Sequence, residues 1–254
     1  MTRQELKKLS WDQIQGKIGK YFLISLIIGV IVGAVGGMLS FPQQIISSLM
    51  TFFSREMEYA AYITEEELMT YMVIIISLSL VSILFTFIQL FLQILVSGPF
   101  YFSDANIFLK ITSGQPISIG DAFSGFKTYW KAVKVYAWQT LFTTLWSFLF
   151  IIPAYVKYYA YSMAPYIALE NPELSAREAC ARSKQIMDGN RWRLFCLTFS
   201  FIGWSILCAF TCGIGNIVLN PYIEAAIADF YREISDTRKL PFTDEDIPIY
   251  IPEA

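Results

Sequence analysis

Two long uncharged runs constrain this chain more than any other feature of its sequence. No charged residue lies between Tyr21 and Phe53, and none lies between Glu67 and Asp104. About 18 consecutive apolar residues are enough to propose a transmembrane helix. The composition agrees, because 55% of the residues are hydrophobic and only 16% are charged, against about 25% charged in a soluble domain. We therefore expect an integral membrane protein whose first apolar segment is an uncleaved anchor, since it is longer than a signal sequence and no small-residue cleavage site follows.

Two other apolar regions are too long to be single spans. Residues 135–169 and 194–230 would form helices of about 52 and 55 Å, whereas the hydrocarbon core is about 30 Å thick. We expect the first region to divide near Ile152-Pro153 and the second at the glycines of residues 212–215. Residues 71–102 could be divided by the same reasoning, so length alone does not fix the number of spans.

The distribution of basic residues resolves that ambiguity. If residues 71–102 form one long helix, tilted or kinked before Pro99, the chain has six spans. All but two of its 19 basic residues then lie in cytoplasmic segments, as the positive-inside rule requires. The exceptions are Arg55, in an acidic outer loop, and Lys157. We therefore predict a multi-pass plasma-membrane protein with both the N and C termini in the cytoplasm.

A proline followed by an aromatic residue occurs three times, at Pro99, Pro165 and Pro221. Aligned on these prolines, the chain falls into three units, each with a polar lead-in segment followed by a membrane hairpin. We predict an all-α polytopic bundle of three parallel hairpins with interfacial amphipathic helices and a helix kink at each repeated proline. We expect residues 1–254 to form a single membrane domain. Its three repeat units span about 1–112, 113–171 and 172–235, and a polar tail follows at 236–254. Coincidence of common membrane residues remains the alternative.

Polar residues within the apolar helices indicate a candidate site. In the second helix Ser82, Thr86, Gln89, Gln93 and Ser97 form one stripe, and in the sixth helix Asn216, Asn220 and Glu224 form another. Polar groups in hydrocarbon need partners, so these stripes should face the interior of the bundle. The candidate intramembrane site comprises Glu224, Asn220, Asn216, Gln89, Gln93 and Lys157. The alternative is that Glu224 is a structural hydrogen-bonding hub between helices.

Several kinds of chemistry lack their usual residues in this sequence. The chain has no histidine and four cysteines, so zinc binding and histidine acid–base catalysis lose their commonest group. Cys208 and Cys212 are four residues apart on one helix face, a spacing that could hold a metal or form a redox pair, but we favour the interpretation that they are small residues packed in a membrane helix. We expect no cofactor, no metal, no nucleic acid and no enzymatic activity. The expected partner is the lipid bilayer, with anionic lipid attracted to the basic segment Arg177–Arg193 at the cytoplasmic face.

Two sequence segments resemble a known family. They are "IIPAYVKYYAYSMAPYIALENPELSAREACARSKQIMDGNRWRLF" and "FIGWSILCAFTCGIGNIVLNPYIEAAIADFY", and they are similar to the bacterial integral-membrane family called domain of unknown function 975. That family occurs chiefly in Firmicutes and is distantly like the membrane domain of some glycerophosphodiester phosphodiesterases. Members often have Pro-Gly where this chain has Pro153-Ala154. The resemblance implies a six-helix plasma-membrane protein and carries over no catalytic or ligand residues.

Three functional hypotheses follow from these patterns. The first is non-enzymatic binding or transport of a small or lipidic substrate through the polar interior of the bundle. The alternative is a structural or protective membrane protein, acting in envelope stress or peptide-toxin immunity through lipid or partner contacts. An intramembrane enzyme using Glu224 and Asp229 comes third, because two carboxylates are a small catalytic inventory. A water-accessible cavity that reaches Glu224 would favour the first hypothesis, and a dry interior the second.

Overall fold

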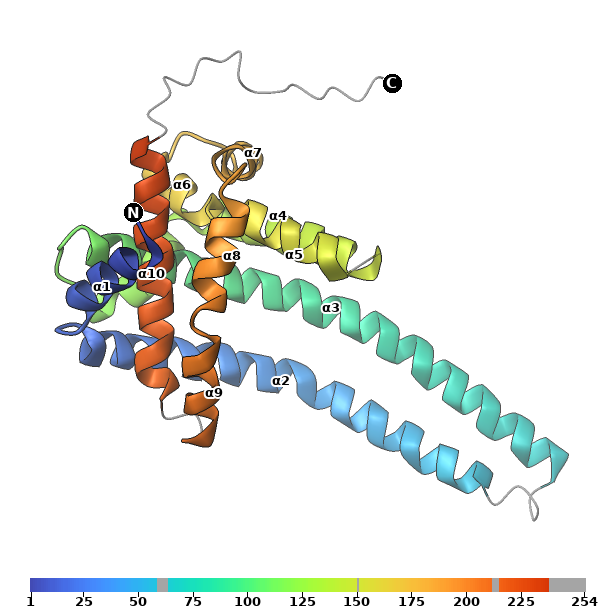
Figure 1. Ribbon diagram of the computed structural model, residues 1–254. Coiled ribbons are helices and arrows are strands. Elements are labelled where there is room, and N and C mark those ends of the chain that lie inside the picture. Colours follow the sequence, from blue (N-terminus) through green and yellow to red (C-terminus); the bar gives the residue numbers. More distant parts are fainter. Residues whose placement is uncertain (59–63, 150, 212–214, 238–254) are drawn as a thin grey trace, which may run out of the picture. The chain divides into compact units, whose positions relative to one another are not determined.

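The structure is a computed structural model that describes residues 1–58, 64–149, 151–211 and 215–237. Within those ranges every regular element is a helix, as Figure 1 shows, so the all-α prediction is confirmed. The chain divides into two compact units. We call Met1–Ile28 together with the chain from Ser97 onward the main unit, and Gly29–Val96 the hairpin unit.

Two long helices form the hairpin unit and continue into the main unit. They are α2 (Ile18–Glu58) and α3 (Glu65–Thr112). Within the hairpin unit Gln43 Nε2 donates a hydrogen bond of 2.6 Å to Ser82 Oγ, so the polar stripe of α3 faces a polar side chain of α2 at this level. The helix α3 runs unbroken through Pro99, and residues 71–102 therefore form one helix, as predicted.

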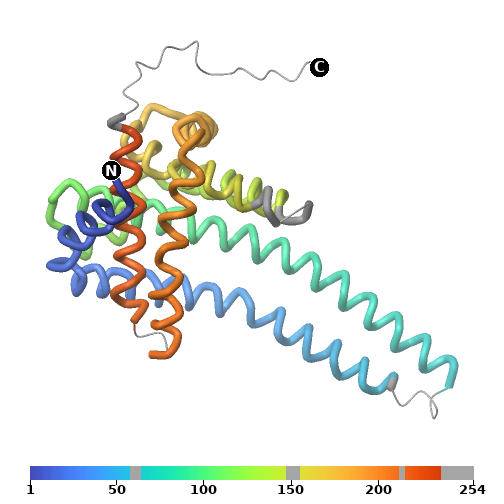
Figure 2. The backbone as a smooth tube through the Cα atoms, in the orientation of Figure 1, coloured from blue at the N-terminus to red at the C-terminus, as the bar shows by residue number. Residues whose placement is uncertain are grey.

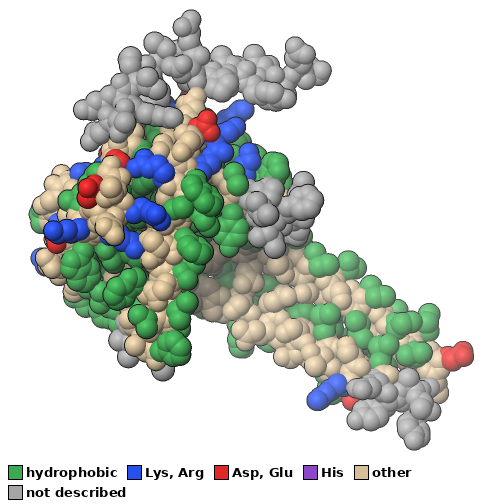
Figure 3. Space-filling view, in the orientation of Figure 1, with side chains coloured by type: hydrophobic (Ala, Val, Ile, Leu, Met, Phe, Trp, Pro, Cys, Tyr) green, Lys and Arg blue, Asp and Glu red, His purple; other side chains and the backbone are tan. Residues whose placement is uncertain are grey.

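Three segments are long and apolar enough to cross a membrane. They are Ile18–Met57, Glu65–Thr112 and Arg191–Phe210. Large apolar side chains on them are exposed, among them Phe87 on α3 and Trp204 in the third segment. Apolar surface of this extent is typical of contact with lipid. In the face of the main unit shown in Figure 3, Lys and Arg side chains gather around α1 and the start of α8, while hydrophobic side chains cover the rest of α8 and α9.

The central part of the main unit is a helical hairpin with a short 3-10 helix before it. The 3-10 helix η2 (Ile119–Thr128) leads into α4 (Tyr129–Leu149), which lies beside α5 (Ile151–Tyr161) in Figures 1 and 2. The boundary between α4 and α5 agrees with the division predicted near Ile152-Pro153. The helix ends after α5, and a new helix, α6 (Ala164–Glu170), begins with Pro165 in its first turn. In the first turn the missing N–H of a proline costs no helical hydrogen bond.

Four helices follow α6 and one precedes α2. The later helices are α7 (Ala176–Ile186), α8 (Arg191–Phe199), α9 (Ile202–Phe210) and α10 (Asn216–Thr237), and the first is α1 (Arg3–Ile14). The helical structure is interrupted between α8 and α9, whereas α10 continues through Pro221. Of the turn predicted at residues 212–215, residues 212–214 lie outside the described part of the chain.

Buried serines connect the short polar helices to their neighbours. Ser10 of α1 donates a hydrogen bond of 2.6 Å to Asp229 Oδ2 of α10, and both residues are buried. Ser183 of α7 donates to the Ala160 carbonyl of α5 at 2.8 Å and accepts from the backbone N–H of Met163 at 3.2 Å. The Ser183 hydroxyl therefore partners two backbone groups, the Ala160 carbonyl and the Met163 N–H, at the point where α5 ends before α6.

The 3-10 helix η2 is held against α3 in a similar way. The backbone N–H of Gly125 donates to Ser103 Oγ at 2.9 Å, and Lys110 forms an ion pair with Asp121 at 2.5 Å. Burial raises the pKa of the Asp121 carboxyl, but hydrogen bonds from Lys110 and Ser118 and the lysine charge outweigh burial and hold the pKa below its ordinary value. This ion pair therefore stabilises the fold at neutral pH.

The close approach of η2 to α3 requires glycine at position 125. A Cβ atom there would lie 1.9 Å from the Pro99 carbonyl oxygen, whereas at Gly120 the nearest atom would be 3.7 Å away. We predict that Gly125→Ala lowers the free energy of unfolding by about 2 kcal/mol or more because the backbones must separate. Gly120→Ala is the matched control and should change it by less than about 1 kcal/mol. Thermal unfolding in detergent measures both, and equal effects of the two substitutions would contradict the prediction.

Candidate functional site

A cavity of about 410 Å³ lies among the helices of the main unit. Its lining comes from the start of α2, the end of α3, α5, α6 and α10. We call it the central cavity. Its polar side chains are Asp104, Ser162, Asn220 and Glu224, and tyrosines from four different helices supply much of the remaining surface.

Helical spacing and the repeated prolines position these side chains. Asn220 and Glu224 are four residues apart on α10 and therefore share a face of that helix. Tyr101 and Asp104 are three residues apart on α3 and share a face for the same reason. Pro165 itself lines the cavity, where the chain passes from α5 to α6. The cavity therefore lies where the three proline-containing segments of the chain come together.

Four tyrosines line the central cavity. Tyr21 and Tyr166 are almost fully buried, at 7% and 4% exposure, whereas Tyr158 is 49% exposed. Tyr101 donates a hydrogen bond of 3.2 Å from its hydroxyl to Gln139 Oε1, which fixes its orientation. Tyr21 and Tyr166 are therefore the buried part of the lining, and Tyr158 is an exposed part of it.

The charges of the cavity are all of one sign. Among the described residues that line it, two are carboxylates and none is Lys or Arg. Asp104 Oδ1 is buried and has no hydrogen-bond partner in the described part of the chain. Glu224 is exposed and belongs to the lining of the cavity. Unpartnered carboxylates in an apolar bundle destabilise the protein, and they are therefore typical of a functional site.

The structure distributes the predicted site residues over several places. Glu224 and Asn220 line the cavity, whereas Asn216, one turn earlier on α10, is exposed and is not in the lining. Gln89 and Gln93 lie on α3 in the hairpin unit. A common site that includes these three residues remains a prediction.

Lys157 precedes Tyr158 in the sequence, but it is not itself part of the cavity lining. Its Nζ is 5.1 Å from the ring centroid of Trp146, a cation–π contact between α5 and α4. Of the three repeated prolines, Pro165 is in the lining, while Pro99 and Pro221 are buried within continuous helices beside it.

The sequence reasoning missed Asp104 and the tyrosines of the cavity. Asp104 was visible only as the charged residue that ends the second uncharged run, and its position five residues after Pro99 was the signal that could have placed it near the repeat. Tyr101 and Tyr158 resemble the interfacial aromatic residues common in membrane proteins. Nothing in their local sequence shows that they meet.

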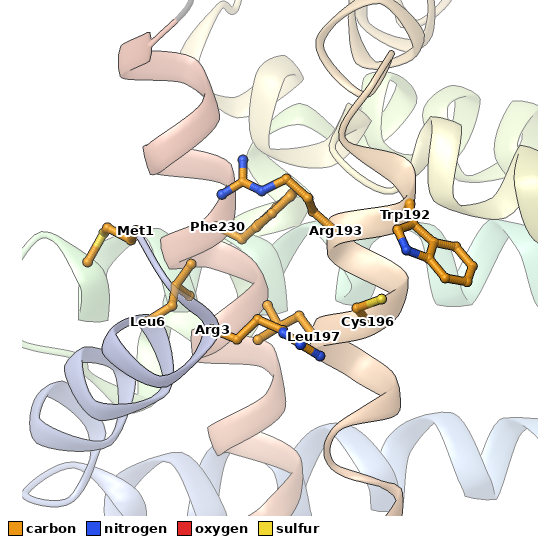
Figure 4. Close-up of a pocket in the computed structure, with 8 residues that line it drawn as sticks. All are labelled: Met1, Arg3, Leu6, Trp192, Arg193, Cys196, Leu197 and Phe230. Atoms are coloured by element: carbon orange, nitrogen blue, oxygen red, sulfur yellow. The ribbon is translucent and has the colours of Figure 1, made fainter.

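A second pocket, of about 290 Å³, lies between α1, α8 and α10 (Figure 4). Arg3 and Arg193 approach it from α1 and α8, and Phe230 contributes from α10. Arg193 is already paired with Glu233 at 2.9 Å and lies over the Phe230 ring at 5.4 Å. The central cavity is the stronger candidate because its charged groups have no such partners.

The described residues contain no cluster of three His, Cys, Asp or Glu side chains that could hold a metal ion. The thiols of Cys180, Cys196 and Cys208 are free, and Cys212 lies outside the described residues.

Residues 150–238 match the model of the family described as "Protein of unknown function (DUF975)". Over these residues the chain is similar to that family. No curated protein and no solved structure matches the chain. The DUF975 region contains α5 to α10, and it therefore contributes Glu224, Asn220, Tyr158 and Tyr166 to the cavity. The family is defined without a function, so no activity is transferred with the match.

A stability comparison tests whether the cavity carboxylates are structural. We predict that Asp104→Asn raises the free energy of unfolding by about 1 kcal/mol, because it removes one of two like charges from a shared cavity. Asp229→Asn should lower it by about 1 to 2 kcal/mol, because Asp229 accepts a hydrogen bond from Ser10. Thermal unfolding of both variants in the same detergent provides the measurement. A loss of stability in Asp104→Asn as large as that in Asp229→Asn would show that Asp104 is a structural hub.

Proposed function

We propose that this protein is a non-enzymatic, multi-pass plasma-membrane protein that binds or moves a small or lipidic molecule through its central cavity. The observation that carries the proposal is the cavity itself, which reaches Glu224 and contains Asp104, whose Oδ1 atom has no hydrogen-bond partner among the described residues. Its volume of about 410 Å³ falls in the range of small-molecule sites, about 300 to 1,000 Å³. A tightly packed interior without such a space would not support binding.

We also propose six spans in three parallel hairpins, with both termini in the cytoplasm. The repeated aromatic residues support this arrangement in two of the three units. Phe100 packs against Phe126 of η2 with 5.2 Å between ring centroids, and Tyr222 packs against Trp11 of α1 with 5.4 Å between ring centroids. In the remaining unit the equivalent Tyr166 stacks on Tyr231 of α10 at 5.2 Å.

The contacts of the three lead-in segments support the repeat further. Each lead-in segment contacts the returning helix of the unit before it: η2 contacts α3, and α7 contacts α5 and α6. The first lead-in helix, α1, contacts the last returning helix, α10. Contacts of this order close a ring, as expected of parallel repeats about an axis along the membrane normal.

The alternative function, a structural or protective role through lipid contacts, is favoured by a different observation. The pocket of Figure 4 combines Arg3 and Arg193 with apolar side chains at the surface of the main unit. A surface of this kind suits an anionic lipid. It requires no central cavity, so the two functions are separable by experiment.

The topology can be tested by cysteine labelling in intact cells. Lys8 on α1 and Glu66 on α3 are both exposed. We predict that a membrane-impermeant maleimide labels Glu66→Cys from outside, and labels Lys8→Cys only after permeabilisation. The unsubstituted protein measures labelling of the native cysteines. Labelling of Lys8→Cys in intact cells would contradict cytoplasmic placement of the N terminus.

The binding function can be tested without knowledge of the ligand. We predict that the protein in lipid nanodiscs is thermally stabilised by at least one compound in a panel of cations, anions, neutral solutes and lysolipids. Binding at a hundred times Kd adds about 2.7 kcal/mol of stability. Ser162→Phe, which fills the cavity, should abolish the effect, whereas Ser48→Phe on the exposed surface of α2 should retain it. No stabilisation by any compound, or equal stabilisation of both variants, would contradict the proposal.

A further inference from the structure

We infer that the ligand of the central cavity is an organic cation whose ammonium head lies between Asp104 and Glu224 and against the tyrosine rings. This inference rests on the proposed binding function and specifies the chemical class of the ligand. It is carried by the lining of the cavity, which combines two carboxylates with four tyrosines in one space.

The charge of the lining selects the sign of the ligand. The described lining contains Asp104 and Glu224 and no basic residue, and Asp104 Oδ1 has no partner among the described residues. A cation between the two carboxylates replaces their mutual repulsion with attraction, which is stronger here than in bulk water. An anion would meet repulsion from both groups, and a neutral ligand would leave them uncompensated.

The remaining surface selects an organic cation over a metal ion. Calcium takes six to eight oxygen ligands, usually with several carboxylates among them, whereas the described residues contain no cluster of three His, Cys, Asp or Glu side chains that could hold a metal ion. The Ser162 hydroxyl is already engaged with the Tyr159 carbonyl at 2.9 Å. Tyrosine rings bind alkylammonium groups through cation–π attraction, and aromatic cages are the usual sites for quaternary ammonium ligands.

Burial indicates how such a ligand enters. Tyr158, Asn220 and Glu224 are exposed, whereas Tyr21 and Tyr166 are buried. We therefore expect the ammonium head to enter beside the exposed Tyr158 and to come to lie between the two carboxylates. The Asn220 amide can then hydrogen-bond to a polar group that follows the head.

Choline and 3,3-dimethylbutan-1-ol provide a direct test, because they have nearly the same shape and differ in charge. Isothermal titration of the full chain in nanodiscs should show choline binding at least about tenfold tighter than the uncharged alcohol. The titration is repeated with saturating sodium chloride in place of choline.

Variants locate the site. Glu224→Gln and Asp104→Asn should each weaken choline binding about tenfold or more. The matched controls Glu173→Gln and Asp12→Asn change exposed carboxylates outside the cavity and should have no effect. Tyr158→Phe, which keeps the ring, should bind choline normally, and Tyr158→Leu should lose about 2-fold to 30-fold in affinity. Thermal unfolding confirms that each variant is folded.

The outcomes separate this inference from the proposed function. Equal binding of choline and the alcohol, or saturation by sodium with no affinity for choline, overturns the organic cation and leaves binding at the cavity standing. The organic cation is also overturned, and binding at the cavity also stands, if no ammonium compound binds while another class of compound stabilises the wild type but not Ser162→Phe. If no class stabilises the protein, both proposals fail. Equal losses in Glu224→Gln and Glu173→Gln overturn the assignment of the site.

Discussion

The requirement that buried polar groups have partners governs this structure more than any other constraint. In hydrocarbon an unpartnered N–H or C=O group costs several kcal/mol, so every break in a helix needs a substitute for the lost helical hydrogen bonds. At the break between α5 and α6, Ser183 serves as acceptor for Met163 N–H and as donor to the Ala160 carbonyl. The short helix α7 therefore stabilises the break, beyond which Pro165 lies in the cavity lining.

The same requirement makes the central cavity distinctive. Ser10, Ser103 and Ser183 are fully buried, and each is hydrogen-bonded. Asp104 Oδ1 lies in the same unit with no partner among the described residues. Asp104 therefore differs from these serines, which have partners within the chain. Tyr101, which also lines the cavity, is oriented by its hydrogen bond to Gln139.

Local patterns in the sequence predicted much of the fold and part of the site. Charge-free runs predicted the apolar helices, and hydrocarbon thickness predicted the division between α4 and α5, because both depend on segment length alone. The spacing of Asn220 and Glu224 placed both on one helix face. The interruption between α8 and α9 was not predicted, because no glycine or proline marks Ser200-Phe201. Asp104 was missed because its importance depends on α3 meeting α10, which are distant in the sequence.

The cavity is divided between two parts of the chain with different relationships to the family. Residues 150–238 match DUF975 and supply Glu224, while Asp104 and Tyr21 come from the part of the chain that precedes the match. One carboxylate of the lining is thus supplied by the family region and the other by α3, before the match begins. Substitutions at Asp104 or Tyr21 therefore alter the cavity while leaving the sequence of the DUF975 region unchanged.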